Sequence, residues 1–171
     1  GSITPGFDNR RLELKPTFWE TGMVVAEVEV DRDTGLVKLV KCVSLDDPGI
    51  TFDEQTATGQ VEGATIQGLG HTLGEEMRYD EEGQLLNSSL MEYRPVMMAD
   101  IADDFRTILV ENQDGPGAFG SRGMGQVHTG AIAPTVASAL AQLTGVYICD
   151  LPLTPSKVWE ALQKAGKTET T

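Results

Sequence analysis

Alternation of apolar and charged positions predicts two strands near the start of the chain. From Met23 to Asp31, valine and alanine residues alternate with glutamates, which is typical of a strand with one buried face. Leu36–Leu45 continues as a second strand. The residues between them, Asp31–Gly35, favour a turn, so we expect a hairpin. Strict alternation places Leu36, Lys38, Val40, Cys42 and Ser44 on one side of the second strand, opposite Val37, Leu39, Lys41, Val43 and Leu45.

Apolar residues at helical spacing predict three helices. The longest lies within Asp53–Met77, a stretch without proline that contains five glycines. Each glycine in a helix interior costs about 1 kcal/mol relative to alanine, so we expect close contacts with a neighbouring element to explain them. A second helix spans Ala131–Leu143 and ends before Gly145. The last helix begins with Thr154 as N-cap and Pro155 as its first residue.

Three shorter segments complete the expected fold. Arg78–Gln84 is a strand end and a turn, whereas Phe105–Glu111 and Val146–Cys149 are short strands. Strands early in the chain and helices later favour a single α+β domain, with a mixed or antiparallel sheet packed against helices. We place this domain at residues 23–167, between an extended lead-in at 1–22 and a tail at 168–171.

Composition narrows the class of protein. The chain has 171 residues, enough for one ordinary domain, and 40% of them are apolar. Its net charge of −13 argues against partners such as nucleic acid or an anionic membrane, because both require clustered Lys and Arg. No window reaches the ~20 apolar residues of a membrane span, and no signal peptide is recognised, so we predict a cytoplasmic protein.

The cysteines and histidines give no sign of a metal site. Cys42 and Cys149 lie in apolar stretches and form no C-x-x-C pair, so we expect two buried free thiols in a reducing compartment. His71 and His128 are too few and too far apart in sequence to hold a metal. We expect His128 to be a surface histidine. The alternative is that it lies near a pocket, because it is two residues from Gln126.

Two glycine-rich segments carry most of the functional information. The first glycine segment, Gly59–Gly70, reads GQVEGATIQGLG, and the second glycine segment, Gly117–Gln126, reads GAFGSRGMGQ. Glycine permits close approach of the backbone to a ligand, and glutamine both donates and accepts hydrogen bonds without bringing charge. Together the two segments favour a polar, uncharged surface suited to a large ligand rich in heteroatoms.

The order of these motifs resembles the C-terminal part of the molybdenum hydroxylase large subunit. That family includes xanthine dehydrogenase, aldehyde oxidoreductase and the aerobic carbon monoxide dehydrogenase. The family patterns are Gly-Gln-x-x-Gly-x-x-x-Gln-Gly-x-Gly and, after a long gap, Gly-x-[Lys/Arg]-Gly-x-Gly-Glu. Further matching pieces are Val24–Asp31 with its Asp33-Thr34-Gly35 turn, Asp47-Pro48-Gly49, Leu73-Gly74-Glu75-Glu76, Met91-Glu92-Tyr93 and Leu151–Pro155.

The resemblance implies a fold, a cofactor and partners. The expected fold is that of the C-terminal molybdopterin-binding domain, and the expected cofactor is molybdopterin with its molybdenum, shared with other domains or chains. The implied partners are the remaining molybdenum-binding domain or subunit, indirectly iron–sulfur and FAD subunits, and a small-molecule substrate. The implied reaction is hydroxylation of an aldehyde or N-heterocycle with oxygen from water. Because the family's large subunit is several times longer, we do not expect this chain to be active alone.

The resemblance also assigns candidate site residues. Gln60 corresponds to the family's glutamine beside the molybdopterin, although a glutamine that caps the helix or faces solvent has the same sequence signal. Gln67, two turns further along, is a packing or supporting residue. Arg122 takes the place of the family's lysine or arginine, with an exposed loop arginine as the alternative. The cofactor-binding set is Gln60, Ser121, Arg122, Gly123, Met124 and Gly125.

Gln126 departs from the family pattern. The family has a glutamate at this position, which acts as general base, whereas an amide cannot accept a proton near neutral pH. This departure leaves three alternatives. Another group supplies the base, the reaction is not a hydroxylation, or this copy of the domain has lost activity. Glu62, Glu75 and Glu76 are poor replacements, since they lie on another helical face or beyond a further turn. The alternative function is a stand-alone ligand-binding or interaction domain that kept the fold and lost the base. A third possibility is a chain excised from a longer subunit, which would explain the length of the sequence but not Gln126.

Overall fold

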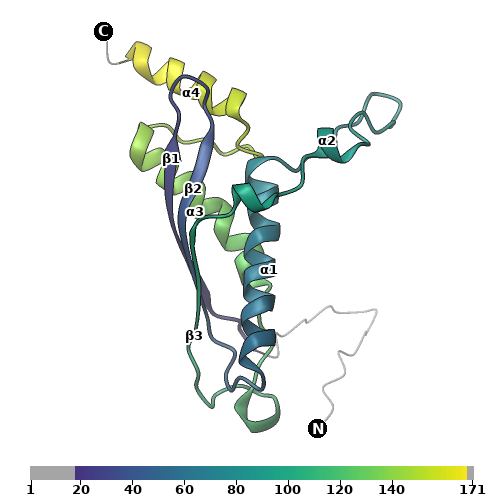
Figure 1. Cartoon of the computed structure of the whole chain (residues 1–171), viewed down its shortest axis with the longest axis vertical. Helices are drawn as coiled ribbons and strands as arrows, with labels where there is room; N and C mark the ends of the chain where they lie inside the picture. Colours follow the sequence, from purple (N-terminus) through teal and green to yellow (C-terminus); the bar gives the residue numbers. More distant parts are fainter. Residues whose placement is uncertain (1–17, 169–171) are drawn as a thin grey trace, which may run out of the picture.

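The computed structural model describes residues 18–168, and it forms a three-stranded sheet covered on one face by helices (Figure 1). The sheet order is β1-β2-β3, with β1 antiparallel and β3 parallel to β2, so the expected α+β fold with a mixed sheet is confirmed. Most of the expected lead-in, residues 1–17, and residues 169–171 of the tail lie outside the described residues. The elements are β1 (Gly22–Val30), β2 (Val37–Asp46), α1 (Glu54–Leu73), α2 (Leu90–Tyr93), β3 (Asp104–Leu109), α3 (Val127–Thr144) and α4 (Pro155–Thr168), with 3₁₀ turns at Met98–Asp100 and Ala118–Gly120.

The predicted hairpin is confirmed, and side chains of its turn accept hydrogen bonds from the turn backbone. Asp31 accepts hydrogen bonds through Oδ1 from the backbone N–H groups of Asp33 at 2.8 Å and Thr34 at 3.2 Å. Gly35 closes the turn with φ of +76°, a conformation that glycine adopts without steric cost. The β1–β2 pair that follows is the framework on which the rest of the sheet is built.

A β-bulge interrupts the alternation expected for β2. Glu27 pairs with Lys41, but the next residue of β1, Val28, pairs with Leu39, so Val40 has no partner across the ladder. An extra residue in one strand shifts the alternation of all later side chains by one position, relative to what strict alternation along the sequence predicts. The prediction of strict alternation is therefore wrong across Val40. The buried residues of β2 are Val37 and Leu39 before the bulge and Cys42, Ser44 and Asp46 after it.

Helices α1 and α3 pack together on the inner face of the sheet and complete the core. Ser44 of β2 and Thr65 of α1, both buried, share a hydrogen bond of 3.0 Å between their hydroxyl groups. Buried polar groups need such partners, because an unpaired group loses its hydrogen bonds to water. The main core cluster comprises Val24, Val37, Leu39, Cys42, Leu69, Ala102, Ile132, Val136, Leu140, Leu153 and Val158.

The glycines of α1 serve two different surfaces. Asp53 caps the helix by accepting a hydrogen bond from the Thr56 N–H at 2.7 Å, so α1 begins at Glu54 and lies within the predicted stretch. Gly68 faces α3, where a Cβ atom would lie 2.5 Å from the Thr129 carbonyl oxygen. In contrast, Gly59 and Gly63 are exposed and have nothing within 4 Å of a built Cβ atom among the described residues. Close packing thus explains Gly68 and does not explain Gly59 or Gly63.

The second half of the chain confirms two helices and corrects one strand. Helix α3 includes the predicted Ala131–Leu143 but begins at Val127, and it ends at Gly145 with φ of +73°. Helix α4 starts at Pro155 as predicted. Val146–Cys149 is not a strand, because it passes along the helices without pairing to the sheet; Ile148 packs against the core. Cys149 is exposed, so only Cys42 fits the expectation of buried thiols.

Two further short predictions are confirmed. Phe105–Glu111 corresponds to β3, and Arg78–Gln84 belongs to a small hairpin closed by a bridge between Tyr79 and Leu85. This hairpin and α2 form an arm that projects from the end of α1 (Figure 1). The arm lies at the opposite end of α1 from the loop that precedes α3.

The two kinds of glycine on α1 predict opposite effects of the same substitution. Gly68→Ala should destabilise the chain by about 1–3 kcal/mol, because the added methyl overpacks the α1–α3 contact. Gly63→Ala should stabilise it by roughly 0.5–1 kcal/mol, because alanine has the higher helix propensity and the site is open. Urea unfolding of both variants provides the measurement, and equal effects would contradict the assigned packing.

Candidate functional site

The second glycine segment folds against the end of β2 at one end of the sheet. The Arg122 N–H donates to the Pro48 carbonyl at 2.9 Å, and the Ile50 N–H donates to the Gly120 carbonyl at 3.3 Å. Gly49 has φ of +69°, and a Cβ atom there would collide with the Gly120 carbonyl oxygen. The Asp47-Pro48-Gly49 corner is thus shaped to receive this segment.

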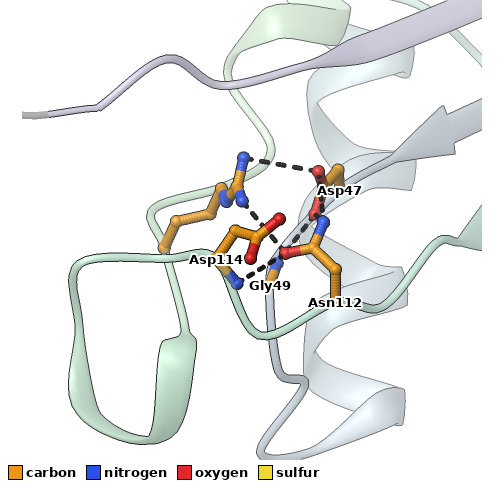
Figure 2. Close-up of polar contacts among 5 residues, drawn as sticks. Asp47, Gly49, Asn112 and Asp114 are labelled. Atoms are coloured by element: carbon orange, nitrogen blue, oxygen red, sulfur yellow. Dashed lines mark hydrogen bonds and ion pairs between the residues drawn. The ribbon is translucent and has the colours of Figure 1, made fainter.

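A polar network fixes the corner (Figure 2). The Asn112 side-chain amide donates to both carboxylate oxygens of Asp47, at 2.8 and 2.7 Å. Its Oδ1 accepts from the Asp114 N–H at 2.9 Å and from Arg122 Nη2 at 3.1 Å. Arg122 Nη1 lies 3.3 Å from Asp47 Oδ2, which completes a triangle of ionic and hydrogen-bonded contacts. We call Asp47, Asn112 and Arg122 the corner network.

The corner network settles one alternative for Arg122. Its side chain is only 12% exposed, so it is not a solvated loop arginine. Arginine suits this position because its planar guanidinium can contact a carboxylate and an amide at once. Its guanidinium is directed to Asp47 and Asn112, which come from the ends of two neighbouring strands. The side chain therefore ties the second glycine segment to the sheet.

Gln60 and Gly125 are brought together by the packing of α1 against the second glycine segment. Gly125 has φ of +102°, and a Cβ atom there would lie 3.4 Å from Gln60 Cβ and 3.5 Å from the Gln60 carbonyl oxygen. The Gln60 side chain is exposed, as is that of Gln126, which precedes the first residue of α3. The residues named by the two sequence motifs thus meet in one place.

An exposed, uncharged strip of α1 extends from this meeting point. We call Gly59, Gln60, Gly63 and Gln67 the glycine face of α1; all four are exposed. At 100° per residue they fall within one side of the helix. Because glycine leaves backbone atoms uncovered, the strip combines accessible main chain with neutral amide side chains. Gln67 faces outward here, so it is not a core packing residue.

Backbone donors are available beside this strip. Within residues 18–168, no hydrogen bond occupies the backbone N–H groups of Gly123, Met124 or Gly125. Ser121 differs, since its N–H donates to the Ala118 carbonyl at 3.1 Å. Successive unpaired N–H groups in a glycine-rich loop can bind an anionic or electron-rich group.

The glutamates considered as replacement bases lie away from Gln126. Glu62 projects from the side of α1 opposite Gln60. Glu75 and Glu76 lie beyond the far end of α1, about 20 Å along the helix from Gln60. Glu75 is also engaged, accepting a hydrogen bond from the Tyr93 hydroxyl at 3.3 Å. None of the three stands beside the second glycine segment.

A buried acid–histidine pair under this segment was missed by the sequence reasoning. His128 is fully buried, so its prediction as a surface histidine is wrong; α3 begins four residues earlier than expected and turns this side chain inward. His128 Nδ1 lies 3.6 Å from Asp46 Oδ1, and Nε2 lies 2.9 Å from the Leu45 carbonyl oxygen. Desolvation raises the pKa of Asp46 from 3.8 to about 6, opposed by His128 and assisted by Glu20 and Asp47.

Two exposed aromatic rings also border the second glycine segment. Phe52 and Phe119 meet edge to face with ring centroids 6.1 Å apart. Both are largely exposed, which is uncommon for a pair of phenylalanines on a free surface. The sequence pattern gave no signal for this pair, because the two residues are brought together only by the corner that Gly49 forms.

The described residues, 18–168, lack two further features. This part of the chain contains no group of three or more His, Cys, Asp or Glu side chains placed to hold a metal ion. None of its helices is both long and apolar enough to cross a membrane.

Comparison with known proteins gives consistent matches. Residues 2–102 match the family model of a molybdopterin cofactor-binding domain. The chain is 36% identical over 143 residues to a probable hypoxanthine oxidase of Escherichia coli K12, covering 84% of this chain and 15% of that protein. It is 32% identical over 152 residues to the gamma subunit of the 6-hydroxypseudooxynicotine dehydrogenase complex of Paenarthrobacter nicotinovorans, covering 86% of this chain and 19% of the relative.

Solved structures give the same result. The fold matches aldehyde oxidoreductase from Desulfovibrio gigas with a TM-score of 0.75 and 29% identity, covering 83% of this chain and 15% of that one. Quinoline 2-oxidoreductase from Pseudomonas putida 86 matches with a TM-score of 0.72 and 28% identity, covering 81% of this chain and 18% of that one. The chain therefore spans less than one fifth of the length of these relatives.

The Asp46–His128 pair predicts a distinct pH dependence. Because the folded chain binds the Asp46 proton more tightly than the unfolded chain, the stability contributed by Asp46 is greatest below about pH 4 and falls as pH rises through about 6. Asp46→Asn removes this titration. The free energy of unfolding of the variant, relative to the parent, should rise between pH 4 and 7 by on the order of 3 kcal/mol. Urea unfolding at several pH values tests this; a constant difference would contradict it.

Proposed function

The chain belongs to the molybdopterin cofactor-binding domain family, and from this premise we propose that it forms one wall of the cofactor site in a molybdenum hydroxylase. The proposed reaction is oxidative hydroxylation of an aldehyde or N-heterocycle with oxygen drawn from water. The proposed partners are the remaining molybdenum-binding portion and, through it, iron–sulfur and FAD components. The chain alone is not proposed to be active.

The observation that carries this proposal is the glycine face of α1 beside Gly125. Gly59 and Gly63 keep a helix surface open that alanine would cover at lower cost in helix stability. Gln60 stands between them with an exposed amide, which suits the mixed donor and acceptor edge of a pterin. The residues present therefore fit a flat, polar, uncharged group that approaches the main chain.

The second glycine segment supplies the other half of the proposed site. The N–H groups of Gly123, Met124 and Gly125, which have no hydrogen-bond partner among the described residues, are suited to bind electron-rich atoms of the cofactor. Ser121 and Arg122 complete the set, and we assign Arg122 a supporting part, since its guanidinium is held by Asp47 and Asn112. The corner network keeps the donors in place before the cofactor binds, which reduces the entropy lost on binding.

The chemistry of the proposed reaction belongs mainly to the cofactor, which supplies two-electron redox capacity when bound. This chain binds and orients. Gln126 stands at the position of the family's base and can hold a ligand by hydrogen bonds, but its amide does not take up a proton near neutral pH. The names of the relatives refer to hypoxanthine, quinoline and aldehyde substrates, which supports the proposed substrate classes without selecting among them.

Gln126 itself favours a second candidate function. A domain that kept the fold and lost the base would bind a ligand or a partner chain without catalysis. The two candidates differ in whether the cofactor is held, so metal content separates them.

Molybdenum content tests the proposed function. When the chain is purified through a tag from its native source, we expect about one molybdenum per chain together with the larger cofactor-binding portion, because this chain supplies only one wall. Elemental analysis of the purified material provides the measurement. Metal-free chain without larger partners would contradict the proposal and support the binding-domain alternative.

A substitution at Gln126 tests the assignment of this residue to the base position. In the complete enzyme, Gln126→Glu should raise turnover of at least one aldehyde or N-heterocycle, by up to the 10²–10⁴-fold typical of general base catalysis. Gln142→Glu is the matched control, since it adds the same charge at an exposed position near the other end of α3. If turnover of every candidate substrate is unchanged by Gln126→Glu, Gln126 does not occupy the base position.

A further inference from the structure

The sheet has a second face that no helix of the described residues covers. Helices α1 and α3 pack on the inner face, where Val24, Cys42 and Ser44 are buried. The alternate residues of the strands point to the other side, which we call the outer sheet face. Antiparallel sheets often leave one face to solvent, but such a face then carries polar side chains.

Only half of the outer sheet face is polar. Strand register places Met23, Leu45 and Ile108 in one row across the three strands. Val25 and Val43 lie in the next row, and Arg106 of β3 is the third member of that row. We define the apolar half of the outer sheet face by its members: Met23, Val25, Val43, Leu45, Ile108 and Val110. Met23, Val25, Ile108 and Val110 are 54%, 52%, 47% and 49% exposed.

The other half carries charged side chains, some of which are paired within the chain. Glu27, Lys41 and Asp104 form the next row, with Lys41 Nζ 3.2 Å from Asp104 Oδ2. Arg106 also pairs with Asp104. Beyond them Glu29 lies opposite Lys38. An apolar patch bordered by solvated polar groups is the usual composition of a protein–protein interface, with the polar rim marking its limit.

The apolar half lies at the end of the sheet that leads into the candidate site. Directly after β3, the Val110 N–H donates to the Asp46 carbonyl at 2.8 Å, and the Asn112 N–H donates to the Gly49 carbonyl at 3.0 Å. Val110 is thus two residues from the corner network. Anything that covers the apolar half reaches the edge of the second glycine segment.

We propose that the apolar half of the outer sheet face is the docking surface for the remaining cofactor-binding portion of the molybdenum hydroxylase. This inference rests on the proposed function and adds to it the surface through which the other walls of the site are attached. The chain spans 15–19% of its relatives' length, so the other walls must come from the rest of such a protein. Covering the sheet at this end would place them beside the corner network, which holds the second glycine segment.

A second copy of the chain is a poorer occupant of this surface. Each copy carries a net charge of −13, so two copies repel one another. The charged half of the same face also ends the apolar surface after two rows, which limits the area that a symmetric contact could bury. A larger partner can extend past the edge of the sheet toward the corner network and bury more.

Cysteine footprinting of the complete enzyme tests the docking surface. In a Cys149→Ser background, Val25→Cys and Ile108→Cys are compared with Glu29→Cys, which lies on the same face of the same sheet but in the charged half. Alkylation rates are measured in the native enzyme and normalised to the urea-unfolded enzyme. Because all three positions are exposed in this chain alone, we expect thiols at 25 and 108 to react about tenfold or more slowly than that at 29.

The outcomes separate this inference from the proposed function. Equal rates at positions 25, 108 and 29 in an enzyme that retains molybdenum would overturn the docking surface alone. A chain that purifies without a larger partner would overturn both. If the thiols at positions 25 and 108 are protected in a particle made only of copies of this chain, the surface serves self-association, and the inference is overturned. Should a cysteine variant fail to assemble, hydroxyl-radical oxidation of Met23 in the unmodified enzyme gives the same answer, protection supporting the inference and rapid oxidation overturning it.

Discussion

The contact between Asp47, Asn112 and Arg122 is the constraint on which the candidate site depends. It joins the end of β2 to the loop after β3, 65 residues later in the sequence, and to the second glycine segment that follows this loop. All three side chains are partly buried, so the ion pair and its hydrogen bonds are less screened by water than a surface pair, and their geometry decides how much they stabilise the fold. Here the amide of Asn112 bridges acid and base, and the loop that carries Gly125 is thereby set against α1 at Gln60.

Helix α1 connects the stable part of the molecule to the functional part. Its inner side packs against β2 and α3 through Val61, Thr65 and Gly68, and this packing compensates for a sequence that is a poor helix former in isolation. Its outer side keeps backbone accessible at Gly59 and Gly63. A helix that met only structural requirements would have larger residues at these two positions, so the family membership of the chain gives them a reason that packing does not.

Much of the fold follows from local sequence patterns, and the remainder depends on contacts that such patterns do not contain. The hairpin, α1, α4 and β3 are determined by periodicity, turn residues and caps, and the motif order indicated the family that the comparisons confirm. Burial of His128 and pairing of Arg122 arise from where α3 begins and where Asn112 lies, which are properties of the packed chain. Val146–Cys149 has the composition of a strand but no neighbouring strand to pair with. For the site, the sequence supplied Gln60 and Gly125 separately, and only the packing of α1 shows that they touch.

The bulge at Val40 has a consequence for how this sheet can change in evolution. Val40 itself has no partner across the ladder, and the residues on either side of it, Leu39 and Lys41, pair with consecutive residues of β1. Removing Val40 would therefore restore a regular ladder and leave Cys42, Ser44 and Asp46 facing the helices. Removing a residue from a regularly paired part of β2 would instead exchange the two sides for the residues beyond it. The bulge is thus a place where the strand can lose a residue without turning its buried side outward.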